Sequence, residues 1–210
     1  MRRRDDRNET ARAAQQRQEE GARATAALAE EYRRQEREKA ALESRRRVLF
    51  EMKENFEGYY AGVKRLLQDC EKGLAGRGIV GVVANLLRVP AELETAMELT
   101  LGTALQNIVA ADEGAAKAAI EYLRQRNYGR ATFLPLTAIR PRLLTAAERK
   151  FLSMPGCLGA ACDLVQTEPA YRVVLEHLLG RTVVVERMED GIRMARASGA
   201  AFRIVTLKGD

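Results

Sequence analysis

The first 57 residues carry a density of charge that separates them from the rest of the chain. Of these 57 positions, 28 are Lys, Arg, Asp or Glu, whereas residues 58–210 hold 36 such residues in 153. A segment that is half charged lacks the apolar surface needed to fold as a globule, while about one quarter charged is normal for a soluble domain. The sequence therefore predicts a charged arm, residues 1–57, joined to a compact domain large enough to bury its own core.

The composition of the arm favours a long helix. It has no proline and a single glycine, Gly21, and it is dominated by the helix formers Ala, Arg, Glu and Gln. One row of a heptad seam is marked by apolar residues spaced in multiples of seven, at Leu28, Leu42, Leu49 and Phe56. One row alone buries little surface. The arm is therefore either a solvated single helix or disordered tail, or one half of a coiled coil whose second helix lies elsewhere.

In the compact domain, β-branched runs alternate with amphipathic helices. Strands are predicted at 79–83, 107–110, 130–134, 182–185 and 202–207. Helices are predicted at 58–72, 91–101, 113–126, 168–179 and 189–197. This alternation indicates an α/β or α+β domain.

The second part of the domain repeats the order of the first. Each copy reads helix, Leu-Gly, strand, helix, glycine, strand, with the Leu-Gly pairs at 101–102 and 179–180. The likeness reflects either an internal duplication or a chance resemblance between α/β units. We assign half-domain I to 58–136 and half-domain II to 168–210. The linker between them, 137–167, is expected to contain a short helix at 145–152.

Several functional classes find no support in the residues. No signal peptide and no apolar run of membrane-spanning length is present, so we expect a cytoplasmic protein. The cysteines Cys70, Cys157 and Cys162 show no CxxC spacing, and His177 is the single histidine, so a metal site has few ligands. No phosphate-binding loop, GxGxxG turn or GxSxG elbow occurs. We place His177 on a helix surface rather than in a catalytic relay, and we expect no enzyme activity.

Basic residues gather where the arm meets the domain. They are Arg45, Arg46, Arg47, Lys53, Lys64 and Arg65, with Arg124, Arg126 and Arg130 later in the chain. Such a cluster suits contacts with DNA phosphates that do not read bases. Because Glu43, Glu51 and Glu54 lie among these bases, the alternative is the solvated face of a charged helix.

Three stretches together resemble a known family. They are Gly78–Ala84 with the helix that ends at Leu101-Gly102, the run Gly-Arg-Ala-Thr-Phe-Leu-Pro-Leu at 129–136, and Phe202–Asp210. The pattern is similar to the hinge domain of structural maintenance of chromosomes (SMC) proteins of the bacterial and archaeal type. The resemblance covers about residues 58–210.

The resemblance implies a hinge of two similar half-domains at the tip of an antiparallel coiled coil, with the arm as the incoming helix. It implies pairing with a second SMC hinge as a homodimer, and non-specific contact with double- or single-stranded DNA at the basic cluster. The expected dimer interface is Gly129, Arg130, Ala131, Thr132, Phe133 and Leu134. The parent protein would act on the chromosome with accessory condensin-type subunits and without a membrane. ATP and Mg²⁺ would bind in its heads, so no cofactor is expected in this chain.

One departure from the family pattern affects these expectations. The last strand of a hinge is followed by a glycine-rich segment that contributes to hinge pairing, whereas this sequence ends at Asp210. We therefore expect a fragment whose half-domain II is truncated and which dimerises poorly by itself. Two alternatives stay open: a DNA-binding module tethered to a coiled coil without a hinge role, and a small α/β enzyme.

Overall fold

A computed structural model covers the chain and describes residues 2–54, 56, 58–75 and 77–210, without the side chains of 2–14, 16, 53 and 54. The chain divides into two compact units, Met1–Asn55 and Phe56–Asp210. No helix in the described part combines the length and the apolar character that crossing a bilayer requires.

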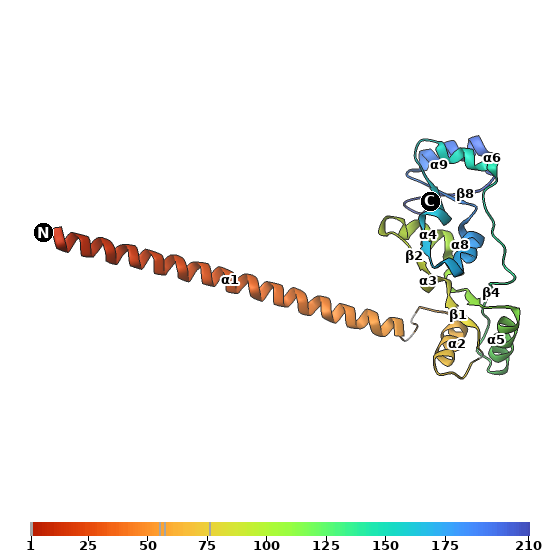
Figure 1. Cartoon of the computed structure of the whole chain (residues 1–210), viewed down its shortest axis with the longest axis horizontal. Coiled ribbons are helices and arrows are strands. Elements are labelled where there is room, and N and C mark those ends of the chain that lie inside the picture. Colours follow the sequence, from red (N-terminus) through yellow and green to blue (C-terminus); the bar gives the residue numbers. More distant parts are fainter. Residues whose placement is uncertain (1, 55, 57, 76) are drawn as a thin grey trace. The chain divides into compact units, whose positions relative to one another are not determined.

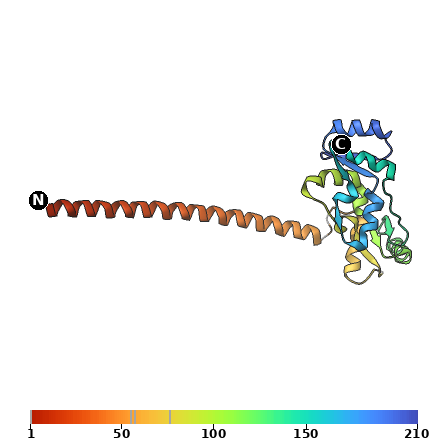
Figure 2. The ribbon, with the colours of Figure 1, turned by 45° about the horizontal axis from the view of Figure 1, so that its top comes forward.

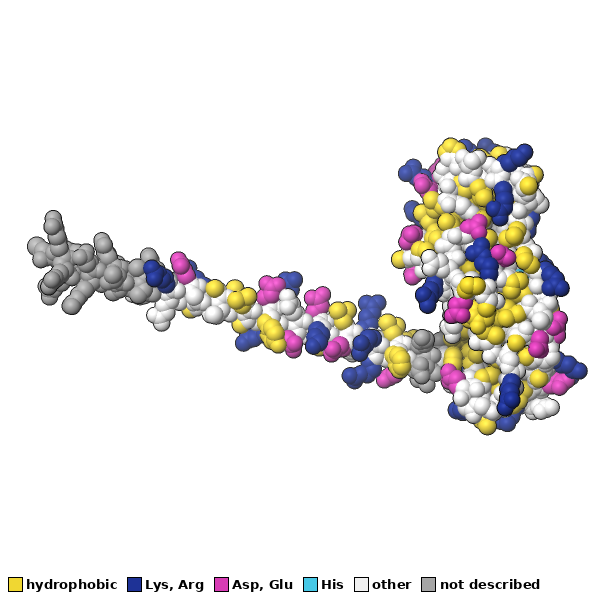
Figure 3. Space-filling view, viewed as in Figure 1, with side chains coloured by type: hydrophobic (Ala, Val, Ile, Leu, Met, Phe, Trp, Pro, Cys, Tyr) yellow, Lys and Arg dark blue, Asp and Glu magenta, His cyan; other side chains and the backbone are white. Residues whose placement is uncertain are grey.

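The first unit is a single helix, α1 (Arg2–Glu54). The helix predicted for the arm is confirmed, and every described side chain from Arg17 to Met52 is exposed. Acidic and basic side chains alternate along it in Figure 3. The assignment of Phe56 to the heptad seam is wrong, because α1 ends before it. Phe56 has a φ of 51° and its ring is buried in the core of the second unit.

The second unit contains two three-stranded sheets of the same design. In each, the first strand is antiparallel to the middle strand and the last is parallel to it. The sheets are β1-β3-β4 and β5-β7-β8. Their strands are β1 (Ile79–Val82), β3 (Ile108–Ala110), β4 (Phe133–Pro135), β5 (Cys157–Ala160), β7 (Thr182–Val185) and β8 (Arg203–Thr206).

Matching details show that the two halves are structural repeats. The first strand of each sheet has a register shift next to a glycine with positive φ, at Gly81 (152°) and Gly159 (138°). The helices follow in the same order in both halves: α3 (Val83–Leu86), α4 (Glu94–Leu101) and α5 (Glu113–Gln125), then α7 (Ala161–Leu164), α8 (Arg172–Leu179) and α9 (Met188–Ser198). As expected, Asp112 caps α5, accepting a hydrogen bond from Ala115 N at 2.7 Å.

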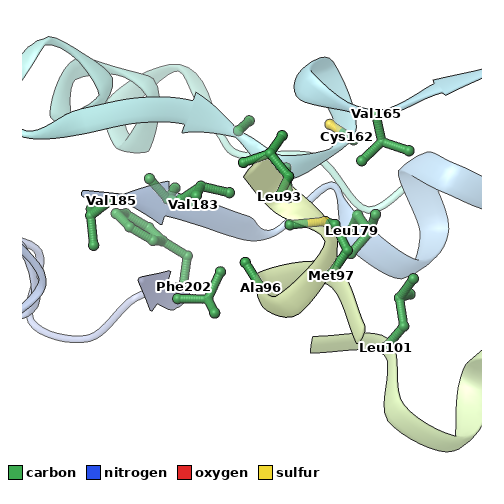
Figure 4. Close-up of a cluster of buried hydrophobic side chains, with 14 of the residues drawn as sticks. Leu93, Ala96, Met97, Leu101, Cys162, Val165, Leu179, Val183, Val185 and Phe202 are labelled. Carbon is green, nitrogen blue, oxygen red and sulfur yellow. The ribbon is translucent and has the colours of Figure 1, made fainter. Parts of the chain in front are cut away.

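Helices α4 and α8 pack across the boundary between the halves. Helix α4 belongs to the first half by sequence, yet its apolar residues Ala96 and Met97 lie in the core around β7 and β8 (Figure 4). Helix α8 contributes to both cores: Val174 is buried with Val83 and Val109 against the first sheet, whereas Leu175 and Leu179 lie in the core around β7 and β8. A small antiparallel sheet, β2 (Leu87–Arg88) with β6 (Gln166–Thr167), joins the halves. Each half therefore completes the core of the other.

The connection between the sheets is shorter than the sequence predicted. Residues 157–167, assigned to the linker, form β5, α7 and β6, so the strand pattern of the second half begins at Cys157. The expected short helix is present as α6 (Ala146–Arg149) and a 3₁₀ turn, capped reciprocally by Thr145 and Glu148. In both ribbon views the connection runs along one side of this unit, from the end holding α2 (Ala61–Glu71) and α5 to the end holding α6 and α9 (Figures 1 and 2).

Candidate functional surfaces

Each three-stranded sheet has two edge strands in the described part of the chain, β1 and β4 in one and β5 and β8 in the other. The edge strand β4 holds the predicted interface residues Phe133 and Leu134, and β8 is its equivalent in the second sheet. Ile108 N–H donates to Thr132 O and Leu136 N–H to Ala110 O, so even-numbered residues of this segment face β3. By alternation, the backbone groups of Phe133 point outward. In β8, Arg203 N–H donates to Arg181 O, so by the same alternation the backbone groups of Ile204 point away from β7. An outward row of backbone groups is a surface on which another strand can pair.

The predicted interface residues surround the β4 edge. Phe133 and Leu134 lie in β4, and Gly129–Thr132 form the irregular segment that leads into it. Gly129 has a φ of 93°, a conformation that favours glycine. A groove of about 590 Å³ runs beside this segment, with the apolar side chains of Ile120 and Leu123 and the guanidinium of Arg124 in its wall. The structure brings the six residues together, and their contact with a second copy stays a prediction.

A basic face lies between α2 and the end of α5. The Arg65 guanidinium carbon is 5.0 Å from the centre of the Tyr128 ring, and that of Arg126 is 5.0 Å from the Tyr122 ring. These distances fit cation–π contacts, which fix the two guanidinium groups. Tyr122 Oη donates to Asp69 Oδ2 at 2.8 Å, and this hydrogen bond raises the pKa of the Tyr122 hydroxyl.

The predicted DNA-contacting residues fall in both units. Lys64 and Arg65 lie on α2 of the second unit, while Arg124 and Arg130 line the groove beside β4. Three others, Arg45–Arg47, are exposed on α1. The Lys53 side chain lies outside the described residues. The bases were identified from the sequence, but the tyrosines that hold Arg65 and Arg126 were not. Tyr128 is distant from Arg65 in the chain, whereas Tyr122 lies four residues before Arg126, a helical spacing that could have marked the pair.

His177 and the cysteines, which the sequence did not support as catalytic residues, lie in packed or hydrogen-bonded positions. His177 lies on α8, with Nδ1 2.9 Å from Arg140 O of the connection. The described cysteines form no disulfide, and burial raises the pKa of the Cys162 thiol to about 11. No group of three or more His, Cys, Asp or Glu side chains with the geometry for a metal ion occurs among the described residues.

A glutamine that the sequence analysis did not single out holds the chain just before α2. Gln106 Oε1 accepts from Tyr60 N–H at 2.7 Å, and its Nε2 donates to Gly58 O at 3.2 Å. Because the partners lie more than 40 residues apart, no local sequence signal marks this contact. It fixes Gly58 and Tyr60 to the segment that leads into β3.

Comparison with known proteins gives a consistent family. The model of the family described as SMC proteins Flexible Hinge Domain matches residues 76–195. The chain is 40% identical over 168 residues to the chromosome partition protein Smc of Bacillus subtilis (strain 168), covering 80% of this chain and 14% of that protein. It is 42% identical over 168 residues to the Smc protein of Desulfitobacterium hafniense (strain Y51), with the same coverage. The chain thus spans about one seventh of the length of these relatives.

Solved structures agree with this result. An asymmetric dimer of the Geobacillus stearothermophilus SMC hinge domain is similar with a TM-score of 0.73 and 40% identity, covering 80% of this chain and 68% of that one. The Pyrococcus furiosus SMC hinge domain is similar with a TM-score of 0.56 and 30% identity, covering 76% of this chain and 78% of that one. The α/β fold of two halves expected from the sequence is confirmed.

Proposed function

Because this chain belongs to the family of SMC flexible hinge domains, we propose that its second unit is a dimerisation module that pairs with a second copy of itself. The observation that carries this proposal is the pair of open edges, β4 and β8, at equivalent positions in two like sheets. An unpaired edge binds another strand through backbone hydrogen bonds. The similar Geobacillus hinge is described as an asymmetric dimer, which supports the pairing of two copies here.

The duplication favours a closed dimer. If β4 of one copy pairs with β8 of the other, a twofold axis generates the same contact a second time. The β4 and β8 edges of both copies are then used in one closed contact. The groove beside residues 129–131 lies next to β4 and would receive side chains that flank the partner's β8. A dimer with two such contacts is the assembly that two equivalent edges support best.

In this proposal α1 is one strand of a coiled coil. Its apolar side chains are exposed, with Leu28 at 70% and Leu42 at 60% of their full accessible area. A row of exposed leucines at heptad spacing gains stability by packing against a second helix. The helix that covers this row would come from another part of a longer protein or from another chain.

DNA contact is a second proposed property of the same unit. Arg65 and Arg126 are held on tyrosine rings, and Arg124 and Arg130 line the groove beside residues 129–131. Fixed guanidinium groups neutralise phosphates with little loss of side-chain entropy, and binding of this kind depends on salt and tolerates any sequence.

The role in the whole protein follows from the relatives. They are named chromosome partition proteins, and this chain spans only 14% of their length. We propose that it links two arms of a chromosome-organising ATPase whose ATP and Mg²⁺ sites lie in heads outside these residues. Accessory condensin-type subunits and location on the chromosome belong to the same proposal.

Sedimentation equilibrium tests the dimerisation. The chain should self-associate weakly, and a version extended at its C-terminus by the next residues of the reading frame should self-associate more tightly. Thr132→Lys places a charge at the exposed β4 edge and should weaken the dimer about tenfold or more. Ala138→Lys adds the same charge at an exposed position beyond the edge and serves as the matched control.

An extended chain that stays monomeric at every concentration would refute the proposal. Equal and tight dimers from both lengths would show that the added segment is dispensable for pairing.

The alternative function is a DNA-binding module tethered to a coiled coil without a hinge role, which the basic face favours. A monomer would then bind DNA tightly and lose binding when Arg45, Arg46 and Arg47 are replaced by Glu. Titration of a labelled duplex, with the oligomeric state measured at the same concentrations, separates the two functions.

A further inference from the structure

The segment that joins α1 to α2 is fastened to the unit that follows it. We call Phe56 and Gly58–Tyr60 the joining segment. The side-chain amide of Gln106 makes two hydrogen bonds to this segment: its Oε1 accepts from Tyr60 N–H at 2.7 Å, and its Nε2 donates to Gly58 O at 3.2 Å. Tyr59 Oη adds a longer bond of 3.3 Å to Asn85 Oδ1. The Phe56 ring is buried in the same core cluster as Val63 and Leu66.

The first turn of α2 touches the lead-in to β4 without a side chain between them. A Cβ atom at Gly62 would lie 2.8 Å from Tyr128 O and 3.3 Å from Arg130 O. The backbone of α2 therefore rests directly on residues 128–130. Any movement of this turn displaces the segment that precedes the β4 edge.

Gln106 is connected to the same edge through the residues that lead into β3. It ends a 3₁₀ turn (Gly102–Gln106) and is followed by Asn107 and then β3. Ile108 N–H, at the start of β3, donates to Thr132 O at 2.8 Å. A hollow of about 400 Å³ has walls from the joining segment (Tyr60), from Gln106 and from the edge residues Arg130–Thr132. Two independent routes thus connect the joining segment to the β4 edge.

We propose that Gln106 and Gly62 couple the joining segment to the β4 edge, so that a change imposed on the chain before α2 alters how this edge pairs with a second copy. The partner is the second copy, and the coupling regulates the pairing described above, so it rests on the proposed function. Coupling free energies are reciprocal. Pairing at β4 must therefore also hold the joining segment more firmly.

Hydrogen exchange measured by mass spectrometry tests the coupling on the whole chain. In Gln106→Ala, both hydrogen bonds to the joining segment are lost. We expect exchange of peptides covering residues 129–134 to be severalfold faster in the monomer at low concentration, since one net hydrogen bond corresponds to roughly a fivefold change. The dimer dissociation constant should rise by a similar factor. Gln106→Glu keeps the acceptor for Tyr60 N–H and loses the donor to Gly58 O, so its effect should be smaller.

Asn85→Ala is the matched comparison, because it removes only the longer bond to the Tyr59 side chain and keeps both Gln106 hydrogen bonds. It should speed exchange at residues 129–134 much less than Gln106→Ala does. The coupling is overturned if Gln106→Ala speeds exchange at residues 58–60 while exchange at 129–134 and the dissociation constant stay at the wild-type values. If the wild type never dimerises, the proposed function fails, and exchange in the monomer still decides the coupling. Should Gln106→Ala unfold, Gln106→Glu gives the same comparison.

Discussion

Met97→Ala is expected to destabilise both sheets of the second unit together. Met97 lies on α4, which belongs to the first half by sequence, but its side chain is 2% exposed within the core around β7 and β8. Removing a buried Met side chain costs about 2–5 kcal/mol, from lost transfer free energy and from the cavity left behind. In a unit of this size, each kcal/mol lowers the melting temperature by about 2–4 °C. The melting temperature should therefore fall by about 4–20 °C.

The assay combines urea denaturation with hydrogen exchange of peptides from both sheets. Leu99→Ala is the matched control, because Leu99 lies on the same helix with 61% of its area exposed. Its effect should stay within about 0.5 kcal/mol of zero. In Met97→Ala, peptides from β1–β3 and from β5–β8 should lose protection by the same factor, since each half completes the core of the other.

Two results would refute this reasoning. A loss of less than about 1 kcal/mol would mean that α4 is not part of the second core. Loss of protection limited to β5, β7 and β8 would mean that the halves open independently despite the helices that pack across their boundary.

Three further predictions concern ion pairing, close packing and DNA. Hydrogen bonding to Arg181 lowers the pKa of Glu148 from 4.5 to about 2, so its stabilisation is complete above about pH 5 and lost as the pH falls toward 2. The difference in melting temperature between wild type and Glu148→Gln should therefore shrink across this interval, and a constant difference would contradict the assignment. Gly62→Ala should lower the melting temperature, because its Cβ would meet Tyr128 O at 2.8 Å, whereas Gly21→Ala, with open space around it, should not. In fluorescence-anisotropy titrations, the logarithm of the DNA-binding constant is plotted against the logarithm of the salt concentration. Arg65→Gln and Arg126→Gln should each make this slope shallower by about 0.9. Arg196→Gln on α9 should leave the slope unchanged.

The elements that the sequence predicted well are those with a local cause. The β-branched run 182–185 forms β7 with the predicted bounds, and α5 begins after its predicted cap, Asp112. The strand β5 was missed because Cys-Leu-Gly-Ala at 157–160 lacks β-branched residues and contains a glycine. That glycine lies at the register shift shared with β1, a feature that becomes visible only when the two sheets are compared.

The surfaces were predictable to a smaller extent. Bases can be counted in a sequence, and the run 129–136 carried the family resemblance, so Arg65 and the β4 edge could be named in advance. The contacts that position them could not. The close packing of Gly62 on Tyr128 and the hydrogen bond between Gln106 and Tyr60 both join residues that are distant in the chain. No local sequence pattern could therefore reveal them.

The repeated fold also explains how the chain leaves each sheet. The β2–β6 pair joins Arg88 to Gln166, which are equivalent residues of the two halves, so an approximate twofold axis passes between them. After β4 the chain crosses to α8, where Arg142 N–H donates to Glu176 O at 3.2 Å.

After β8 the chain turns toward α4, where Gly209 packs so closely against the Leu99 side chain that a Cβ atom would overlap Leu99 Cδ1. Each third strand is thus followed by a segment that lies on a helix of the other half. The chain that follows takes up part of each outer edge, since Pro135 O accepts from Ala138 and Ile139 N–H and Thr206 N–H donates to Asp210 O, which leaves Phe133 of β4 and Ile204 of β8 facing outward. Two such edges, related by the same axis, are what a closed pairing of two copies requires.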